Sequence, residues 1–439
     1  MSIEPQPTPK VTTLRKSVGL LGVVTFGAGT AIGVSIFSIL QPTAEVAGSG
    51  LLAAMGIAAL PMLVFAVAYA YLGSALPVSG ASYEWPSRFI HPGVGFMIAW
   101  LRIIANVGAL TILSQVMLGY LGMVVAIPLK PAMAVAITAI FALNYVGVSI
   151  AARMQSWLMG LLLIALAIFV AAGLPLLDPA LVGTRLAAPP LAILAAVPLM
   201  ISLFMGIESA VEIGEEVRDA SRNIPLGIAL AIGLTVVVYG LVAVTALGLV
   251  GPGVLGASKA PLLSAANAAL GDLAVPLIVS AACLSISKSM NASALMFSRS
   301  LFAMARGGAL PRWLDAIHPR FGTPHRAIVL AYFCAMMGLM LPPSLVFLLL
   351  AVNVPTMMKY MACSYSATVV ARKHPEIHAR ARVRIAPRTV VVVGYAGVVC
   401  ALIMALLGIE ADPRPYALIG AWFVIGLVYW FAKQRYDAR

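Results

Sequence analysis

A lysine inside an apolar segment is the residue best placed to do chemistry in this chain. Lys288 lies in the run CLSISKSMNASALMFSRS, and the next basic side chains after it are Arg299 and Arg306. At about 1.5 Å per helical residue these lie roughly 16 Å and 27 Å further along a helix, so the ammonium does not snorkel to water beside them. A charge inside a bilayer is costly and is retained where it has a function. Lys288 therefore predicts a solute- or ion-handling site near the middle of a membrane protein.

Four more ionisable side chains fall within apolar segments. They are Arg102, Glu208, Glu212 and Lys359. Together with Lys288 they comprise three cations and two carboxylates, which leaves one positive charge in excess if all are ionised. Because low-dielectric surroundings amplify unpaired charge, we expect pairing or neutralisation among them.

Each of these polar positions has two interpretations. Glu208 is expected either to carry coupling protons or to brace a broken helix through hydrogen bonds. Lys359 belongs either to a site or pathway or to a buried ion pair. Glu212 is expected in an inner gate or loop network, and Arg102 in a structural role. Asn106 either contacts a substrate or joins two helices.

The composition requires a membrane protein. Of 439 residues, 62% are hydrophobic and 10% are charged, and the mean hydropathy is +1.02. A bilayer core of about 30 Å is crossed by about 20 apolar residues in a helix. We expect an all-α integral membrane protein with twelve such segments, near 18–40, 50–76, 94–124, 131–150, 155–177, 191–214, 226–250, 272–305, 326–341, 344–371, 389–409 and 415–432.

The net charge of +13 is distributed unevenly between the loops. Lys130, Arg185, Lys259 and Arg414 fall in the loops expected outside, and the other basic loop residues fall in those expected inside. This asymmetry follows the positive-inside rule and predicts both termini in the cytoplasm. It also explains the basic composition without a nucleic-acid partner. The lipid bilayer is the partner that the composition requires.

Neither the cysteines nor the histidines suggest a metal, a cofactor or an enzyme. The four cysteines all lie in apolar segments, without the close pairs typical of metal or redox sites. The five histidines all lie in polar loops. We therefore expect no cofactor and no bound metal, and we set aside a membrane enzyme or a receptor.

Two of the expected membrane segments are interrupted by glycine. The first reads FGAGTAIGVSIF, with Gly27, Gly29 and Gly33, and the sixth reads LFMGIESAVEIGEEV, with Gly206. Glycine-interrupted helices at matching positions of two halves indicate a midplane binding site in inverted-repeat transporters. Unwinding there exposes backbone N–H and C=O groups, which bind a carboxylate and an ammonium at half-helix ends.

Four motifs, in order along the chain, resemble those of the amino acid–polyamine–organocation superfamily of permeases. Residues 29–37, GTAIGVSIF, resemble G-x-x-I-G-x-G-I-F, and residues 76–83, LPVSGASY, resemble L-P-x-S-G-G-x-Y. Residues 206–225 run from GIES to EEVRDASRNIP and resemble G-F-E … E-E-V-x-N-P-x-R-N-I-P. Residues 298–311 resemble S-R … A-M-A-R-D-G-x-L-P.

The resemblance implies a leucine-transporter-type fold with a five-plus-five inverted repeat and broken first and sixth helices. Residues 1–17 would then form a cytoplasmic tail, and residues 18–177 the first repeat. The second repeat would cover residues 191–371. Two further helices would lie in 389–432, and residues 433–439 would form a second cytoplasmic tail.

The resemblance also implies where a substrate binds. Its carboxylate would lie on the break of the first helix, at Ile32, Gly33, Val34 and Ser35. Its amine would lie on carbonyls of the sixth-helix break, at Phe204, Gly206 and Ile207. The position of an aromatic gate in family members that take bulky or cationic amino acids corresponds to Ser202 here.

Lys288 has three interpretations within this family. In sodium-coupled relatives, the eighth helix and the first break hold a sodium ion, and in some proton-coupled relatives a lysine of the fifth helix replaces it. The matching fifth-helix position here is Leu162, so Lys288 is expected to supply the tethered cation from the eighth helix. The alternatives are contact with a substrate carboxylate, or a static pair with Glu208 or with a carbonyl.

Together these patterns predict a sodium-independent secondary active transporter in the cell's cytoplasmic membrane. It would move a small amine-bearing metabolite, in the first place an amino acid, by alternating access. Proton symport and exchange are both open. The alternative is a carrier of organic anions or acidic amino acids that uses Lys288 and Lys359.

Overall fold

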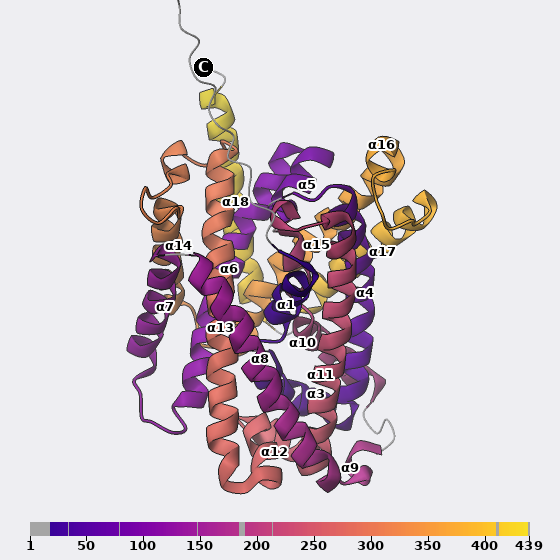
Figure 1. Ribbon diagram of the computed structural model, residues 1–439, viewed down its shortest axis with the longest axis vertical. Coiled ribbons are helices and arrows are strands. Elements are labelled where there is room, and N and C mark those ends of the chain that lie inside the picture. Colours follow the sequence, from indigo (N-terminus) through magenta and orange to yellow (C-terminus); the bar gives the residue numbers. More distant parts are fainter. Residues whose placement is uncertain are drawn as a thin grey trace, which may run out of the picture.

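The computed structural model describes residues 18–33, 35–78, 80–146, 148–183, 189–212, 214–409 and 412–437. Within these ranges the chain is helical, and the extended backbone contributes one isolated bridge between Val18 and Val217. The helices run mostly along the long axis of the molecule (Figure 1). The prediction of an all-α membrane protein is confirmed.

The first part of the chain carries five longer helices and several short ones. They are α1 (Leu20–Ala31), α2 (Ser35–Ser38), α3 (Leu40–Ala47), η1 (Gly48–Gly50), α4 (Leu51–Ala75), α5 (Ala81–Phe89), α6 (Pro92–Leu121), α7 (Leu129–Val146), α8 (Val148–Gly173), η2 (Leu174–Leu176) and α9 (Pro179–Gly183).

The second part is built in the same manner. Its helices are α10 (Pro190–Met200), η3 (Ile201–Leu203), η4 (Ile207–Glu212), η5 (Gly214–Glu216), α11 (Ala220–Ala257), α12 (Pro261–Leu270), η6 (Gly271–Leu273), α13 (Ala274–Arg306), η7 (Arg312–Asp315), α14 (His325–Met337), η8 (Gly338–Met340), α15 (Leu345–Lys373), α16 (Pro375–His378), α17 (Pro387–Leu407) and α18 (Arg414–Asp437).

Local sequence explains several helix starts. α6 begins at Pro92, whose fixed φ suits a first helical residue, and His91 Nδ1 accepts from the Gly93 N–H at 3.1 Å. α15 begins after Ser344, whose hydroxyl accepts from the Phe347 N–H at 3.4 Å. These caps satisfy amide groups that have no partner inside the helix.

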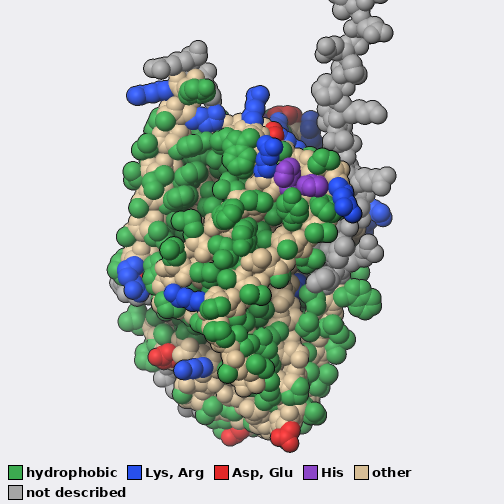
Figure 2. Space-filling view, turned by 90° about the vertical axis from the view of Figure 1, so that its left-hand side faces the viewer, with side chains coloured by type: hydrophobic (Ala, Val, Ile, Leu, Met, Phe, Trp, Pro, Cys, Tyr) green, Lys and Arg blue, Asp and Glu red, His purple; other side chains and the backbone are tan. Residues whose placement is uncertain are grey.

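Ten helices of the described chain are long and apolar enough to cross a membrane. Two shorter apolar helical stretches, Pro190–Leu203 and His325–Met340, occupy the segments expected for the sixth and ninth crossings. The outer surface is correspondingly apolar. Figure 2 shows hydrophobic side chains over the middle of one face, with most of the basic side chains near the end where the described chain finishes.

The first membrane segment is interrupted where its glycines predict. α1 ends at Ala31, Ile32 has φ −77° and ψ 78°, and helix resumes with α2 at Ser35. The sixth segment is interrupted after η3, and Gly206 has φ +105°. A side chain is strained at such an angle, so this turn requires glycine.

The two interrupted segments lie in the interior of the bundle. α1 packs against α11, η4, α8 and α13, and Figure 1 shows it near the centre of the molecule. α13 in turn packs against α6, and α15 packs against α4, α5 and α6. The unwound backbone is thereby enclosed by helices, which is the condition for irregular backbone at membrane depth.

Candidate functional site

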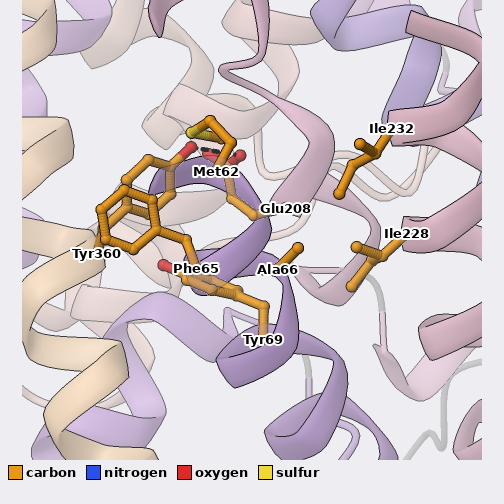
Figure 3. Close-up of a pocket in the computed structure, with 8 residues that line it drawn as sticks. All are labelled: Met62, Phe65, Ala66, Tyr69, Glu208, Ile228, Ile232 and Tyr360. Carbon is orange, nitrogen blue, oxygen red and sulfur yellow. Dashed lines mark hydrogen bonds between the residues drawn. The ribbon is translucent and has the colours of Figure 1, made fainter. Parts of the chain in front are cut away.

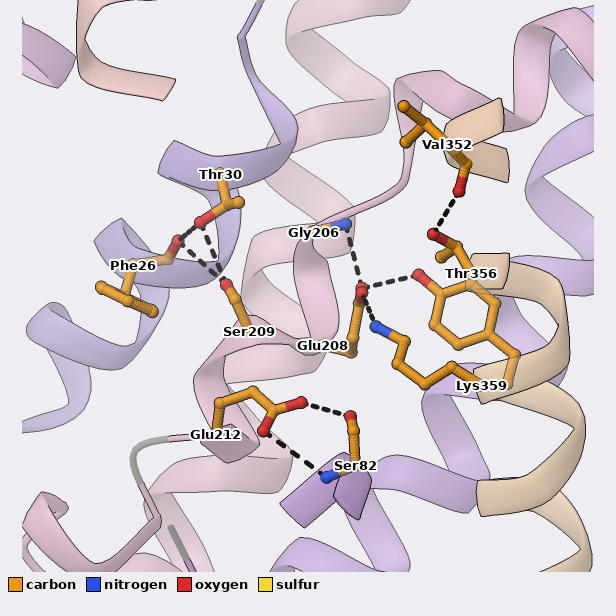
Figure 4. A network of polar contacts seen from close by, with 11 residues as sticks. Phe26, Thr30, Ser82, Gly206, Glu208, Ser209, Glu212, Val352, Thr356 and Lys359 are labelled. Atoms are coloured by element: carbon orange, nitrogen blue, oxygen red, sulfur yellow. Dashed lines mark hydrogen bonds and ion pairs between the residues drawn. The ribbon is translucent and has the colours of Figure 1, made fainter. Parts of the chain in front are cut away.

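The two helix breaks lie directly against each other. A Cβ at Gly206 would lie 2.8 Å from Thr30 Cγ2 and 3.0 Å from the Thr30 carbonyl carbon, so a larger residue would force the segments apart. Just beyond, Thr30 Oγ1 and Ser209 Oγ are 3.0 Å apart, and both hydroxyls donate to the Phe26 carbonyl (Figure 4). This crossing places the exposed backbone of both breaks in one region.

At the first break, a tyrosine of α11 partners the unwound backbone. The Gly33 N–H is shared between the Ala31 carbonyl, at 2.9 Å, and the Tyr239 hydroxyl, at 3.2 Å. Tyr239 Oη donates in turn to the Ala31 carbonyl at 2.7 Å. A Cβ on Gly33 would overlap the Ser289 hydroxyl of α13. Tyr239 was not among the predicted site residues; its sequence signal is a phenol in the middle of an otherwise apolar segment.

Lys288 reaches the first break from α13. Its Nζ donates to the Ile32 carbonyl at 3.0 Å and lies 3.4 Å from Met159 Sδ of α8. The Ser285 hydroxyl donates to the same carbonyl at 3.5 Å. The lysine is 1% exposed. The ammonium is therefore held by a carbonyl oxygen that the helix break has released.

The structure separates Lys288 from the membrane carboxylates. No acidic side chain in the described ranges lies within salt-bridge distance of it. The alternative of a static pair between Lys288 and Glu208 is wrong, because Glu208 binds Lys359 instead. Leu162 of α8, the residue expected at the fifth-helix lysine position, is fully buried.

Glu208 is the centre of a second buried network, beside the sixth-helix break. Its Oε1 accepts from Lys359 Nζ at 2.5 Å, and its Oε2 accepts from the Tyr360 hydroxyl at 2.7 Å (Figure 4). Oε2 also accepts from the Gly206 N–H at 2.9 Å. Lys359 is 1% exposed and Glu208 8%. This geometry favours the buried-pair interpretation of Lys359 and the brace interpretation of Glu208.

Glu212 joins the sixth segment to the loop after α4. Its carboxylate accepts from the Ser82 hydroxyl and, at 3.5 Å, from the Ser82 N–H, and its carbonyl accepts from the Gly80 N–H at 3.1 Å. Ser82 and Gly80 belong to the LPVSGASY motif. Arg102 of α6 is half-buried.

The remaining predicted site residues are distributed around the breaks. Ser35 Oγ donates to the Ser202 carbonyl at 3.0 Å, which links the two interrupted segments a second time. Phe204 is 1% exposed and Asn106 7%. Val34 lies outside the described residues, and of Ile207 the structure describes the backbone, at the start of η4.

A small cavity lies next to Glu208 on the side of α4 and α11 (Figure 3). Its volume is about 10 Å³, the room of a single water molecule, so it is not a substrate chamber. Apart from the carboxylate and the phenol rings, its walls are aliphatic or aromatic hydrocarbon. They are formed by Met62, Phe65, Ala66, Tyr69, Glu208, Ile228, Ile232 and Tyr360.

The apolar exterior and the membrane-length helices define a multi-pass membrane protein. Its family and its transporter-named relatives make it a transporter and not an enzyme. The family model described as amino acid permease matches residues 18–432. The chain belongs to this family, within the amino acid–polyamine–organocation superfamily.

Several known proteins are similar in sequence to this chain. The chain is 35% identical over 327 residues to an uncharacterized transporter of Mycobacterium tuberculosis, which covers 74% of this chain and 73% of the relative. It is 24% identical to a branched-chain amino acid permease of Bacillus subtilis, over 96% of this chain and 94% of that one. It is also 27% identical to the human cystine/glutamate transporter, over 75% of this chain and 68% of that one.

Proposed function

We propose that the protein is a sodium-independent secondary active transporter of a small amine-bearing metabolite, in the first place an amino acid. Its transport is by alternating access, as proton symport or exchange, across the cytoplasmic membrane, with both termini inside. Twelve crossings follow if the two shorter apolar helical stretches also span the bilayer. Residues 18–177 and 191–371 would then be the inverted repeats, followed by two helices in 389–432.

The observation that supports sodium independence is the contact between Lys288 and the first break. The Lys288 ammonium lies 3.0 Å from the Ile32 carbonyl, where the family resemblance would put a sodium ion in sodium-coupled members. A tethered ammonium supplies the positive charge that those backbone oxygens would otherwise take from a metal ion. Since the ammonium also carries an exchangeable proton, the same group would serve proton coupling.

The substrate class follows from the two kinds of exposed backbone. The Gly33 N–H offers a donor to a carboxylate, and the carbonyls of the sixth break offer acceptors to an amine. Tyr239 occupies the Gly33 N–H in the described conformation, so the carboxylate would displace the phenol. The name of the Bacillus subtilis relative, a branched-chain amino acid permease, supports an amino acid.

A carrier of acidic amino acids or other organic anions is the second candidate. It is favoured by Lys288, which has no carboxylate partner in the described part of the chain. An anionic substrate would balance that charge. The name of the human relative, a cystine/glutamate transporter, points the same way.

The test begins with ligand binding to the purified full-length protein in sodium-free detergent buffer. A panel of amino acids, amines and carboxylates is screened by thermal shift, because a bound ligand raises the melting temperature by mass action. Stabilisation by neutral amino acids supports the first candidate. Stabilisation by acidic amino acids or other carboxylates, and not by neutral amino acids, supports the second.

Transport of the stabilising ligand is then measured in proteoliposomes with and without sodium, and with and without a pH gradient. We expect the same uptake without sodium. Lys288→Met should lose uptake by about tenfold or more while still binding the ligand, since the conformational cycle loses its tethered cation. Lys259→Met, at an exposed loop lysine, is the control. Uptake that needs sodium in the unmutated protein would overturn the proposal.

A further inference from the structure

The Glu208 carboxylate lies where a cationic group would otherwise bind. It accepts the Gly206 N–H, so it lies within hydrogen-bond distance of the sixth-helix break. It is buried, and an anion in such surroundings strongly attracts any cation that reaches it. Without Lys359, the carboxylate would therefore be an open cation site at the edge of the proposed substrate site.

Lys359 fills that cation site from within the chain. Its ammonium lies 2.5 Å from Glu208 Oε1 and 4.8 Å from the centre of the Tyr360 ring. The Tyr360 hydroxyl and the Gly206 N–H also donate to the carboxylate. On the α4 and α11 side, the small cavity beside the carboxylate has mostly apolar walls and the room of a single water molecule. A substrate cation would have to displace Lys359 or lie beside it.

The other ionisable side chains around the breaks leave the region with a net positive charge. Glu212 faces Ser82, and Arg102, half-buried on α6, adds a cation. Lys288 contributes a further cation at the first break. The three cations Arg102, Lys288 and Lys359 outnumber the two carboxylates Glu208 and Glu212, so one positive charge is in excess.

We infer that Lys359 is a specificity-determining residue, whose tethered ammonium makes the permease select against substrates with a cationic side chain. The inference rests on the proposed function, which has the substrate at the two breaks. Selectivity is a difference between two affinities, and an unfavourable like charge is an effective way to create it. Amino acids without a cationic side chain are the class that this balance favours, and cationic amino acids and polyamines are the class that it rejects.

Matched ligand pairs isolate the side-chain charge from its length. The pairs are 2-aminobutyrate with 2,4-diaminobutyrate, norvaline with ornithine, and norleucine with free lysine. Dissociation constants are measured on the purified full-length protein near neutral pH, and exchange is measured in proteoliposomes. For every pair that binds, we expect the neutral member to bind at least about tenfold more tightly than the cationic one.

Two single substitutions should move the ratio of the dissociation constants within a ligand pair in opposite directions. Lys359→Met exposes the Glu208 carboxylate, so the preference should shrink by about tenfold or invert toward the cationic member. Glu208→Gln leaves the Lys359 ammonium without its counter-ion, so rejection of the cationic member should deepen. The double variant removes both charges together and should return to the unmutated ratio. Lys259→Met, at an exposed loop position, should leave the ratio unchanged.

The possible outcomes separate this inference from the function on which it rests. If no amino acid of any pair binds, the proposed function fails and the inference fails with it. If amino acids bind but the unmutated protein takes both members equally, the inference alone is overturned. It is also overturned if folded Lys359→Met keeps the original ratio. Should Lys359→Met not fold, an unchanged ratio in Glu208→Gln would overturn it by itself.

Discussion

Lys288 and Lys359 are two buried lysines at two breaks, and they differ in what balances their charge. Each is 1% exposed. Lys359 is 2.5 Å from a carboxylate that has two further donors. Lys288 instead donates to the Ile32 carbonyl and contacts a thioether. The full negative charge of a carboxylate holds Lys359, whereas the partial charge of a carbonyl oxygen holds Lys288.

This difference indicates that Lys359 braces two segments of the bundle, whereas Lys288 can exchange a proton or a partner. Lys359 links α15 to the sixth break through Glu208, so removing either partner leaves a charge alone in a low-dielectric interior. Lys288 links α13 to the first break through one neutral acceptor. Its charge is the one that a proton, a substrate or a conformational change can alter without leaving another ion alone.

The largest effect on stability should follow Lys359→Met. Because it leaves the Glu208 carboxylate buried without its cation, we expect a loss of about 3–5 kcal/mol in the free energy of unfolding. The measurement is thermal unfolding in one detergent, compared with Lys259→Met. Adding Glu208→Gln to the variant should recover most of the loss. A Lys359→Met protein as stable as the original would show that the pair is not a brace.

Tyr360→Phe should have the next largest effect. It removes one of three donors to an ionised carboxylate, and a hydrogen bond to a charged group contributes about 1.5–3 kcal/mol. The Glu208→Gln background provides the control, since there the acceptor is neutral and the same substitution should cost less. Equal losses in both backgrounds would mean that the phenol acts through packing.

Tyr239→Phe tests the corresponding hydroxyl at the Lys288 break. It removes a hydroxyl that accepts from the Gly33 N–H and donates to the Ala31 carbonyl. Because both partners are neutral, we expect a loss of about 0.5–1.5 kcal/mol in the free energy of unfolding. Ligand affinity should rise at the same time, because the carboxylate no longer displaces the hydroxyl. A stability loss larger than that of Tyr360→Phe would contradict the expectation that the hydroxyl at the sixth break contributes more stability than the one at the first break.

The smallest effect on stability should follow Lys288→Met. The substitution replaces a buried cation that has one neutral acceptor with an apolar side chain of similar length. We therefore expect the free energy of unfolding to stay within about 1 kcal/mol of the original or to increase. Thermal unfolding and uptake are measured on the same preparation, since uptake should be lost. A destabilisation as large as that of Lys359→Met would remove the distinction between the two lysines.

Much of the architecture follows from the sequence because membrane helices carry strong local signals. A long apolar run must form a helix in a bilayer, where every backbone group needs an internal partner. The first break was predicted from Gly27, Gly29 and Gly33, and the sixth from Gly206. The Gly206 turn at φ +105° shows the reason, because that angle favours glycine.

The pairing of the membrane charges was less predictable. The sequence indicates an excess of one positive charge, but it suggested Glu208 only as an alternative partner of Lys288 and named no partner for Lys359. The actual partner of Glu208, Lys359, lies 151 residues away along the chain. Tyr239 was not predicted at all, because its partners are backbone atoms 206 and 208 residues away.

The amino-acid sequence by itself therefore determined a helical membrane permease with two glycine-interrupted segments and five ionisable groups within its membrane segments. Apolar length, glycine and charge each act within a few residues of chain, so their consequences can be recognised locally. Only the tertiary structure decided that Lys359 neutralises Glu208 while Lys288 rests on the Ile32 carbonyl. Electrostatic pairing depends on distances of a few ångströms between helices, and those distances are set by how the helices pack.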